Sequence, residues 1–141
     1  MKCWKYRNDM PQVPVRLIGK ISVEEWALVD SGATYCVVHP TIAIAMELKF
    51  TGEKQVYGLG SKKPVLADVA NIELEIGDFR EKIDVVCIKE EYYPIKAHKV
   101  IIGRNFLNKY AIILDGEKIY LEDKEMLKKK LREYNQTSPC Q

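Results

Sequence analysis

The chain has 141 residues, of which 47% are hydrophobic and 30% charged, as is typical of one soluble globular domain and not of a disordered or fibrous chain. Its formal net charge of +2 is too balanced to predict nucleic-acid binding. No apolar run approaches the about 18 residues of a membrane span, and no secretory signal is recognisable, so we expect a cytoplasmic protein without a membrane partner.

The first predicted strands lie between residues 13 and 29. Apolar and polar side chains alternate over residues 13–17, and Pro14 favours an edge position because it lacks an N–H group. Ile21 and Val23 continue this alternation toward residues 26–29, an apolar run that predicts a buried strand.

The later strands are separated by recognisable turns. Residues 72–76 alternate aliphatic and acidic side chains, Gly77-Asp78 supplies turn chemistry, and residues 82–88 form another strand-like run. Residues 112–114 and 119–121 flank Asp115-Gly116. Because an Asp-Gly step tolerates positive φ angles, this segment predicts a tight hairpin.

Few helices are expected. Pro40 suits the first position of a short helix reaching about Leu48, and residues 104–110 predict a second. Leu127, Leu131 and Tyr134 lie on one side of a predicted C-terminal helix. Its basic side is expected to be solvated, with an anionic partner as the alternative. We therefore predict a mainly β domain over residues 1–122, then a charged helix and flexible tail over 123–141.

The most informative motif is Asp30-Ser31-Gly32-Ala33, which follows the predicted buried strand. A carboxylate there is costly to desolvate unless it accepts hydrogen bonds or holds a proton. Ser31 offers a short hydroxyl group, and Gly32 allows a sharp turn or a close approach by a ligand. The alternative interpretation is an ordinary Asx turn after a strand.

Two more segments strengthen the motif. Residues 100–103 form another apolar run that ends at Gly103, and Arg104 and Asn105 follow it. Between the two lies Tyr57-Gly58-Leu59-Gly60, a glycine-rich segment of the kind that forms a mobile hairpin tip over a bound ligand. An ordinary loop is the alternative. A phosphate-binding loop is excluded because the GxxxxGK[ST] pattern is absent.

In this order the three segments resemble the retropepsins, the retroviral-type aspartic proteases, over about residues 13–121. Viral members commonly have an aspartate that pairs with the helix arginine where this chain has Thr34. With Thr34 at this position and with the Asp115-Gly116 hairpin, the chain resembles the cellular and prokaryotic members more closely. Arg104 then needs another partner, either a carboxylate elsewhere or backbone carbonyls. The resemblance implies a closed β-barrel lobe with a flap hairpin and short helices.

The resemblance also implies the chemistry and the site. Aspartic proteolysis needs two carboxylates around one water molecule, and this chain has a single Asp-Ser/Thr-Gly motif, so a homodimer is expected. No cofactor or metal is implied. The implied catalytic residues are Asp30, Ser31 and Gly32; those implied to bind a peptide substrate are Ala33, Tyr57, Gly58, Leu59 and Gly60; Gly103, Arg104 and Asn105 are implied to be structural.

Two other functions are alternatives to this interpretation. A non-catalytic domain of the same fold that dimerises or binds peptides is the second hypothesis, and a β-barrel that binds nucleic acid is a third with little support from charge. His39 and His98 lack partners at metal-ligand spacing and are expected to be surface or loop histidines and not ligands. Cys36 is expected to be a small core residue without a base beside it.

Overall fold

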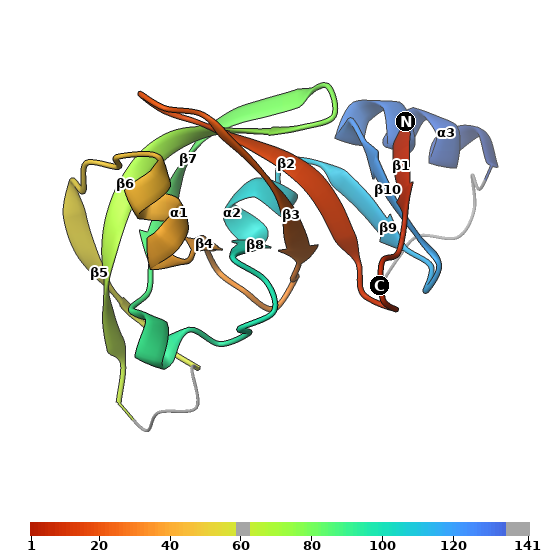
Figure 1. The fold of residues 1–141 in the computed structure, drawn as a ribbon. Coiled ribbons are helices and arrows are strands. Elements are labelled where there is room, and N and C mark those ends of the chain that lie inside the picture. Colours follow the sequence, from red (N-terminus) through yellow and green to blue (C-terminus); the bar gives the residue numbers. More distant parts are fainter. Residues whose placement is uncertain (59–62, 135–141) are drawn as a thin grey trace.

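The computed structural model describes residues 1–58 and 63–134. Six strands form a closed barrel, because β2 pairs with β3 on one side and with β6 on the other (Figure 1). β5 (Gly52–Val56) continues the sheet beyond β6. The barrel strands, in spatial order, are β2 (Gln12–Ile18), β3 (Val23–Val29), β8 (Val100–Ile102), β4 (Cys36–Val38), β7 (Phe79–Cys87) and β6 (Val65–Ile76).

The position of β8 determines how the chain is arranged around Asp30. β8 pairs in parallel with β3 and antiparallel with β4. The loop of residues 30–35, which joins β3 to β4, therefore has to cross the end of β8, where Gly103 follows. Two buried clusters stabilise this arrangement, the larger inside the barrel and a smaller one that includes Val37, Val86 and Ile101.

The ends of the chain form a separate three-stranded sheet, which we call the terminal sheet. Its strands are β1 (Lys2–Lys5), β10 (Lys118–Glu122) and β9 (Ala111–Leu114), in that spatial order. The predicted hairpin at Asp115-Gly116 is confirmed. Gly116 has a φ of +89°, and the Asp115 carboxylate accepts hydrogen bonds from the N–H groups of Glu117 and Lys118.

The helices occur where they were predicted but two are shorter. α1 (Pro40–Ala45) begins after His39, whose side chain accepts a hydrogen bond from the Thr41 N–H group. It ends early because Glu47 has a φ of +51°. α2 covers Arg104–Leu107, and α3 covers Lys124–Tyr134 with its basic side exposed. A 3₁₀ turn, η1, covers Glu90–Tyr92.

The structure corrects several expectations. Trp26 is 39% exposed and stacks under the Arg7 guanidinium, so the buried part of β3 is only residues 27–29. β7 begins at Phe79, before the predicted residue 82, because Gly77 makes a tight turn with a φ of +59°. His98 lies in a loop, one of the two positions expected for it, and is buried there. The predicted tail of residues 135–141 lies outside the described residues.

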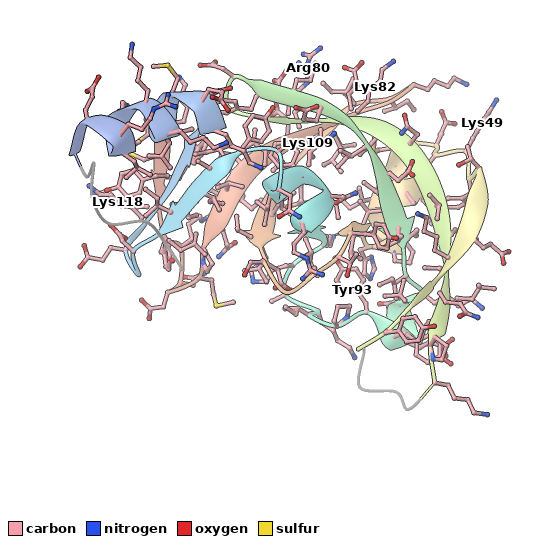
Figure 2. The ribbon with its side chains drawn as sticks, turned by 180° about the vertical axis from the view of Figure 1, so that it is seen from behind. Lys49, Arg80, Lys82, Tyr93, Lys109 and Lys118 are labelled. Atoms are coloured by element: carbon pink, nitrogen blue, oxygen red, sulfur yellow. The ribbon has the colours of Figure 1, made fainter. Side chains whose placement is uncertain are left out.

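Two smaller observations complete the fold. Pro14 lies where β2 pairs with β3 alone, since the pairing with β6 starts at Arg16, and the predicted edge position is confirmed. On the β6–β7 hairpin, Arg80 forms ion pairs with Glu73 and Glu75 (Figure 2). None of the helices in the described ranges is both long enough and apolar enough to cross a membrane.

Candidate active site

The loop after β3 holds the Asp30 carboxylate in a defined orientation. The Asp30 N–H group donates to the Ile102 carbonyl at 3.0 Å, so the residue is anchored to β8. The N–H group of Gly32 donates to Asp30 Oδ1 at 2.9 Å, and that of Ala33 donates to the Asp30 carbonyl at 3.2 Å. Asp30 is half-buried, while Ser31 and Gly32 are exposed. The atoms that form the Asx turn therefore also belong to the candidate site.

Gly103 is required by the close contact between β8 and the Asp30 loop. A Cβ atom at this position would lie 2.3 Å from the Tyr35 carbonyl oxygen and 2.9 Å from that of Ala33. Both atoms belong to backbone, which cannot move away as a flexible side chain can. The loop therefore packs directly on the end of β8, and any side chain larger than hydrogen would displace it.

Arg104 supports the loop through backbone and side-chain contacts. Its N–H group donates to the Ala33 carbonyl at 2.8 Å. The guanidinium donates to the carbonyls of Ser31 and Gly32 at 3.0 and 3.2 Å, and to Thr34 Oγ1 at 3.1 Å. Of the two partners left open by the sequence, backbone carbonyls are therefore correct, with the Thr34 hydroxyl in addition. Arg104 positions the residues around Asp30 without needing a carboxylate.

Asn105 and Cys36 tie the loop to the barrel. The Asn105 side chain accepts from the Cys36 N–H group at 2.8 Å and donates to the Asp84 carbonyl at 2.6 Å, which links β4 to β7. The Cys36 sulfur accepts a hydrogen bond from the Gly103 N–H group at 3.4 Å. Burial raises the pKa of Cys36 to about 12. Cys36 is a neutral core thiol, as predicted, and not a nucleophile.

This burial predicts selective alkylation of the cysteines. At pH 8, a thiol with a pKa of about 12 is ionised in only about one molecule in ten thousand. We expect iodoacetamide to modify the exposed Cys3 in the folded protein and to spare Cys36 and Cys87. All three should react in denaturant, which peptide mass mapping would measure. Equal labelling of Cys3 and Cys36 in the folded protein would contradict the buried position of Cys36.

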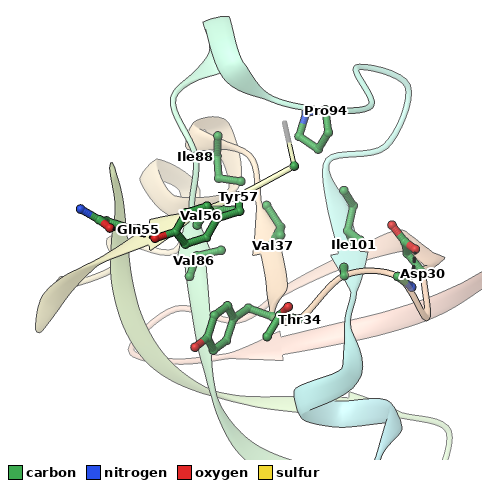
Figure 3. A pocket seen from close by; sticks show the side chains of 14 residues that line it. Asp30, Thr34, Val37, Gln55, Val56, Tyr57, Val86, Ile88, Pro94 and Ile101 are labelled. Carbon is green, nitrogen blue, oxygen red and sulfur yellow. Dashed lines mark hydrogen bonds between the residues drawn. The ribbon is translucent and has the colours of Figure 1, made fainter. Parts of the chain in front are cut away.

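A cleft of about 510 Å³ adjoins Asp30 (Figure 3). Its apolar surface comes from β4, β7 and β8, and residues near the end of β5 form the opposite side. Among the described residues that line it, Asp30 is the sole carboxylate. The described lining residues are Asp30, Gly32, Ala33, Thr34, Tyr35, Val37, Gln55, Val56, Tyr57, Gly58, Val86, Ile88, Pro94 and Ile101.

The predicted flap is a hairpin formed by β5 and β6, whose last register pair is Val56 with Val65. Tyr57 is 72% exposed, and Gly58 has a φ of +84°, which favours glycine. Both residues line the cleft with Asp30, as expected. Leu59 and Gly60 lie outside the described residues.

Sequence reasoning missed part of the cleft. Pro94 lines it from the segment after η1, for which no element was predicted, and Tyr93 beside it is buried. Tyr35 was also missed. Its position five residues after Asp30, next to the buried Cys36, was the available signal, because it places Tyr35 at the start of the strand that follows the loop.

Comparison with protein families matches residues 13–106 to the aspartyl protease family, whereas comparison with curated proteins finds no match. Among solved structures, the retropepsin-like aspartic protease from Rickettsia conorii has a TM-score of 0.62 at 14% identity, with 86% of this chain and 89% of that chain covered. EIAV protease complexed with the inhibitor HBY-793 has a TM-score of 0.52 at 17% identity, with coverages of 73% and 90%.

A third solved structure, the foamy viral protease-reverse transcriptase in complex with an RNA/DNA hybrid, has a TM-score of 0.52 at 19% identity; 73% of this chain and 12% of that chain are covered. At these identities the solved structures establish the fold alone. From the family match and the closed barrel, we conclude that the chain belongs to the aspartyl protease family and has a retropepsin-like fold.

Proposed function

We propose that the protein is a homodimeric aspartic endopeptidase in which each subunit contributes Asp30 to one shared site. The observation that carries this proposal is the position of the Asp30 carboxylate. It lies beside a cleft of about 510 Å³ under the flap hairpin, on a loop that donates a hydrogen bond to β8 and accepts hydrogen bonds from α2. A structural aspartate in an Asx turn needs neither the cleft nor the flap.

The proposed reaction needs no covalent intermediate. Two close carboxylates cannot both be ionised cheaply, so the two Asp30 side chains would share one proton. The ionised member takes a proton from the attacking water, and the protonated member donates to the peptide carbonyl oxygen. The water oxygen thereby bonds to the carbonyl carbon. The C–N bond then breaks as the first carboxyl passes its proton to the leaving nitrogen and the second recovers a proton from a hydroxyl of the tetrahedral intermediate, which restores the starting pair.

The second subunit is required because the chain has a single Asp-Ser-Gly segment. Ser31 is exposed beside Asp30, where its hydroxyl would hydrogen-bond across the two-fold axis and support both loops. The terminal sheet offers an edge for association, since β9 is one of its two outer strands and Ile113 and Leu114 are each 42% exposed. An apolar strand edge of this kind favours pairing with another strand.

The substrate would be a peptide in extended conformation. Ala33 and Gly32 line the cleft from the Asp30 loop, and Tyr57 and Gly58 line it from the flap. We propose that backbone groups of these segments, together with Leu59 and Gly60, hold the peptide by β-type hydrogen bonds. The apolar surface formed by the barrel strands would then receive alternate side chains of the peptide.

Incubation with an unfolded protein at acidic to neutral pH tests the activity. We expect fragments in mass spectrometry, and we expect a statine-type transition-state mimic to suppress them. Inhibitors of serine, cysteine and metal-dependent proteases should have no effect and serve as controls. Absence of fragments at every pH would leave the non-catalytic alternative, a domain that dimerises or binds peptides.

Association is tested independently by analytical ultracentrifugation. We expect a species of twice the chain mass, because one subunit supplies only half of the carboxylate pair. Charged substitutions on the β9 edge, such as Ile113→Lys, should weaken association and reduce cleavage together, whereas the exposed Leu66→Lys should change neither association nor folding. A wild-type protein that stays monomeric at all concentrations while cleaving peptides would contradict the shared site.

A further inference from the structure

The flap strand β5 carries a cation, Lys54, whose side chain contacts a residue of the cleft, Tyr35. Lys54 and Val56 are two residues apart on β5 and are both half-buried, whereas Glu53 and Gln55 between and before them are exposed. Side chains two residues apart on a strand share a face. Gln55 and Val56 both line the cleft, so this end of β5 borders it, although Lys54 is not itself among the described residues that line the cleft.

The Lys54 ammonium lies against Tyr35, another cleft residue. Lys54 Nζ donates to the Tyr35 hydroxyl at 3.4 Å and lies 4.6 Å from the centre of its ring. This is a cation–π contact combined with a long hydrogen bond. No ion pair joins Lys54 to a carboxylate among the described residues, although seven other cationic groups of the chain have such pairs.

The two side chains together retain donors that suit an anion. An ammonium has three N–H donors, and a tyrosine hydroxyl that accepts a hydrogen bond still has its own proton to donate. A carboxylate placed between them would receive two hydrogen bonds, one of them charge-assisted. Arg104, a second cation beside the Asp30 loop, already donates to the carbonyls of Ser31 and Gly32 and to Thr34.

We infer that Lys54 and Tyr35 form a subsite that recognises an Asp or Glu side chain of the substrate, an inference that rests on the proposed peptidase function. The neighbouring surface is apolar, with Val37, Val86 and Ile101, so the acidic side chain is selected at one position between apolar ones. In a symmetric homodimer the subsite occurs twice. Acidic residues are therefore preferred at two positions, one on each side of the cleaved bond.

The test is a cleavage profile on a peptide library prepared from a digested proteome and read by mass spectrometry. The wild type should enrich Asp and Glu at two fixed positions by roughly fivefold or more over Asn and Gln. Lys54→Met keeps the apolar stem and should abolish this enrichment. Lys54→Glu should replace it with an enrichment of Lys and Arg. Tyr35→Phe should retain part of the preference, because the ammonium remains.

Lys49→Met is the matched control. Lys49 is exposed and precedes β5, at the opposite end of the flap hairpin from Gly58 (Figure 2). The cleavage profile of Lys49→Met should therefore equal that of the wild type. Cleavage with the same profile in the wild type, Lys54→Met and Lys54→Glu would overturn the subsite and leave the peptidase function intact. No cleavage by the wild type would overturn the peptidase function, and the subsite with it. Circular dichroism establishes that each variant is folded.

Discussion

Asp30→Asn should lower kcat/KM for peptide cleavage by about a thousandfold or more, because an amide neither takes a proton from water nor shares one with the opposite carboxylate. The fold should be unchanged. Asn keeps the Oδ1 atom that accepts the Gly32 N–H group at 2.9 Å, and Asp30 is only half-buried. Initial rates on an unfolded protein substrate measure the first effect, and thermal unfolding measures the second.

Asp115→Asn is the matched control for this substitution. Asp115 also accepts backbone hydrogen bonds within a turn, from Glu117 and Lys118, but it is on the β9–β10 hairpin and outside the cleft. These contacts hold the pKa of Asp115 below its usual value, so its amide variant loses a little stability and no activity. If both variants cleaved as the wild type does, Asp30 would not be catalytic.

Mixing wild type with Asp30→Asn shows whether the site is shared. If subunits exchange freely and two Asp30 carboxylates are needed, adding one equivalent of the variant should reduce the activity of a fixed amount of wild type to about half, because only matched wild-type pairs remain active. Asp115→Asn added in the same way should not reduce it. Activity that does not respond to Asp30→Asn would mean that one chain carries a complete site.

Gly103→Ala should lower the free energy of unfolding by about 2–4 kcal/mol. The new methyl group would lie 2.3 Å from the Tyr35 carbonyl oxygen, so the Asp30 loop or β8 has to shift. The hydrogen bonds from Asp30 to Ile102 and from Arg104 to Ala33 would weaken with that shift. Chemical denaturation measures the loss, and cleavage activity should fall even at temperatures where the variant remains folded.

Gly52→Ala provides the comparison for this result. A Cβ atom on Gly52 meets nothing within 4 Å. The free energy of unfolding of this variant should therefore lie within about 0.5 kcal/mol of the wild-type value. If Gly103→Ala proves too unstable to purify without additives, a stabilising osmolyte can be included. The denaturation midpoints of Gly103→Ala and Gly52→Ala are then compared under the same conditions. Equal stability of the two alanine variants would contradict the packing of the Asp30 loop on β8.

Features determined by local chemistry were predictable from the sequence. The Asp115-Gly116 turn, the start of α1 at Pro40 and the sharp turn at Gly32 each depend on residues a few positions apart. The barrel was predicted through a resemblance, since alternation alone does not specify strand order. The resemblance also identified Gly103 as structural, but the clash that explains it involves Tyr35, on a distant part of the chain.

Features that depend on distant partners were not predictable. The carbonyl partners of Arg104 are more than 70 residues away in sequence, and nothing near Arg104 indicates them. Trp26 was expected to be buried because its neighbours are apolar. Its side chain is instead 39% exposed, with the Arg7 guanidinium packed on its ring. Pro94 reaches the cleft through the path of a segment without regular structure.

The insertion of β8 between β3 and β4 has a consequence for protein synthesis. When a ribosome has translated Asp30, the residues that hold its loop, Ile102, Arg104 and Asn105, do not yet exist. The nascent polypeptide therefore passes through most of its translation with an unsupported aspartate. The Asp30 loop can take up its final position only after this late segment has emerged from the exit tunnel and β8 has been inserted between β3 and β4.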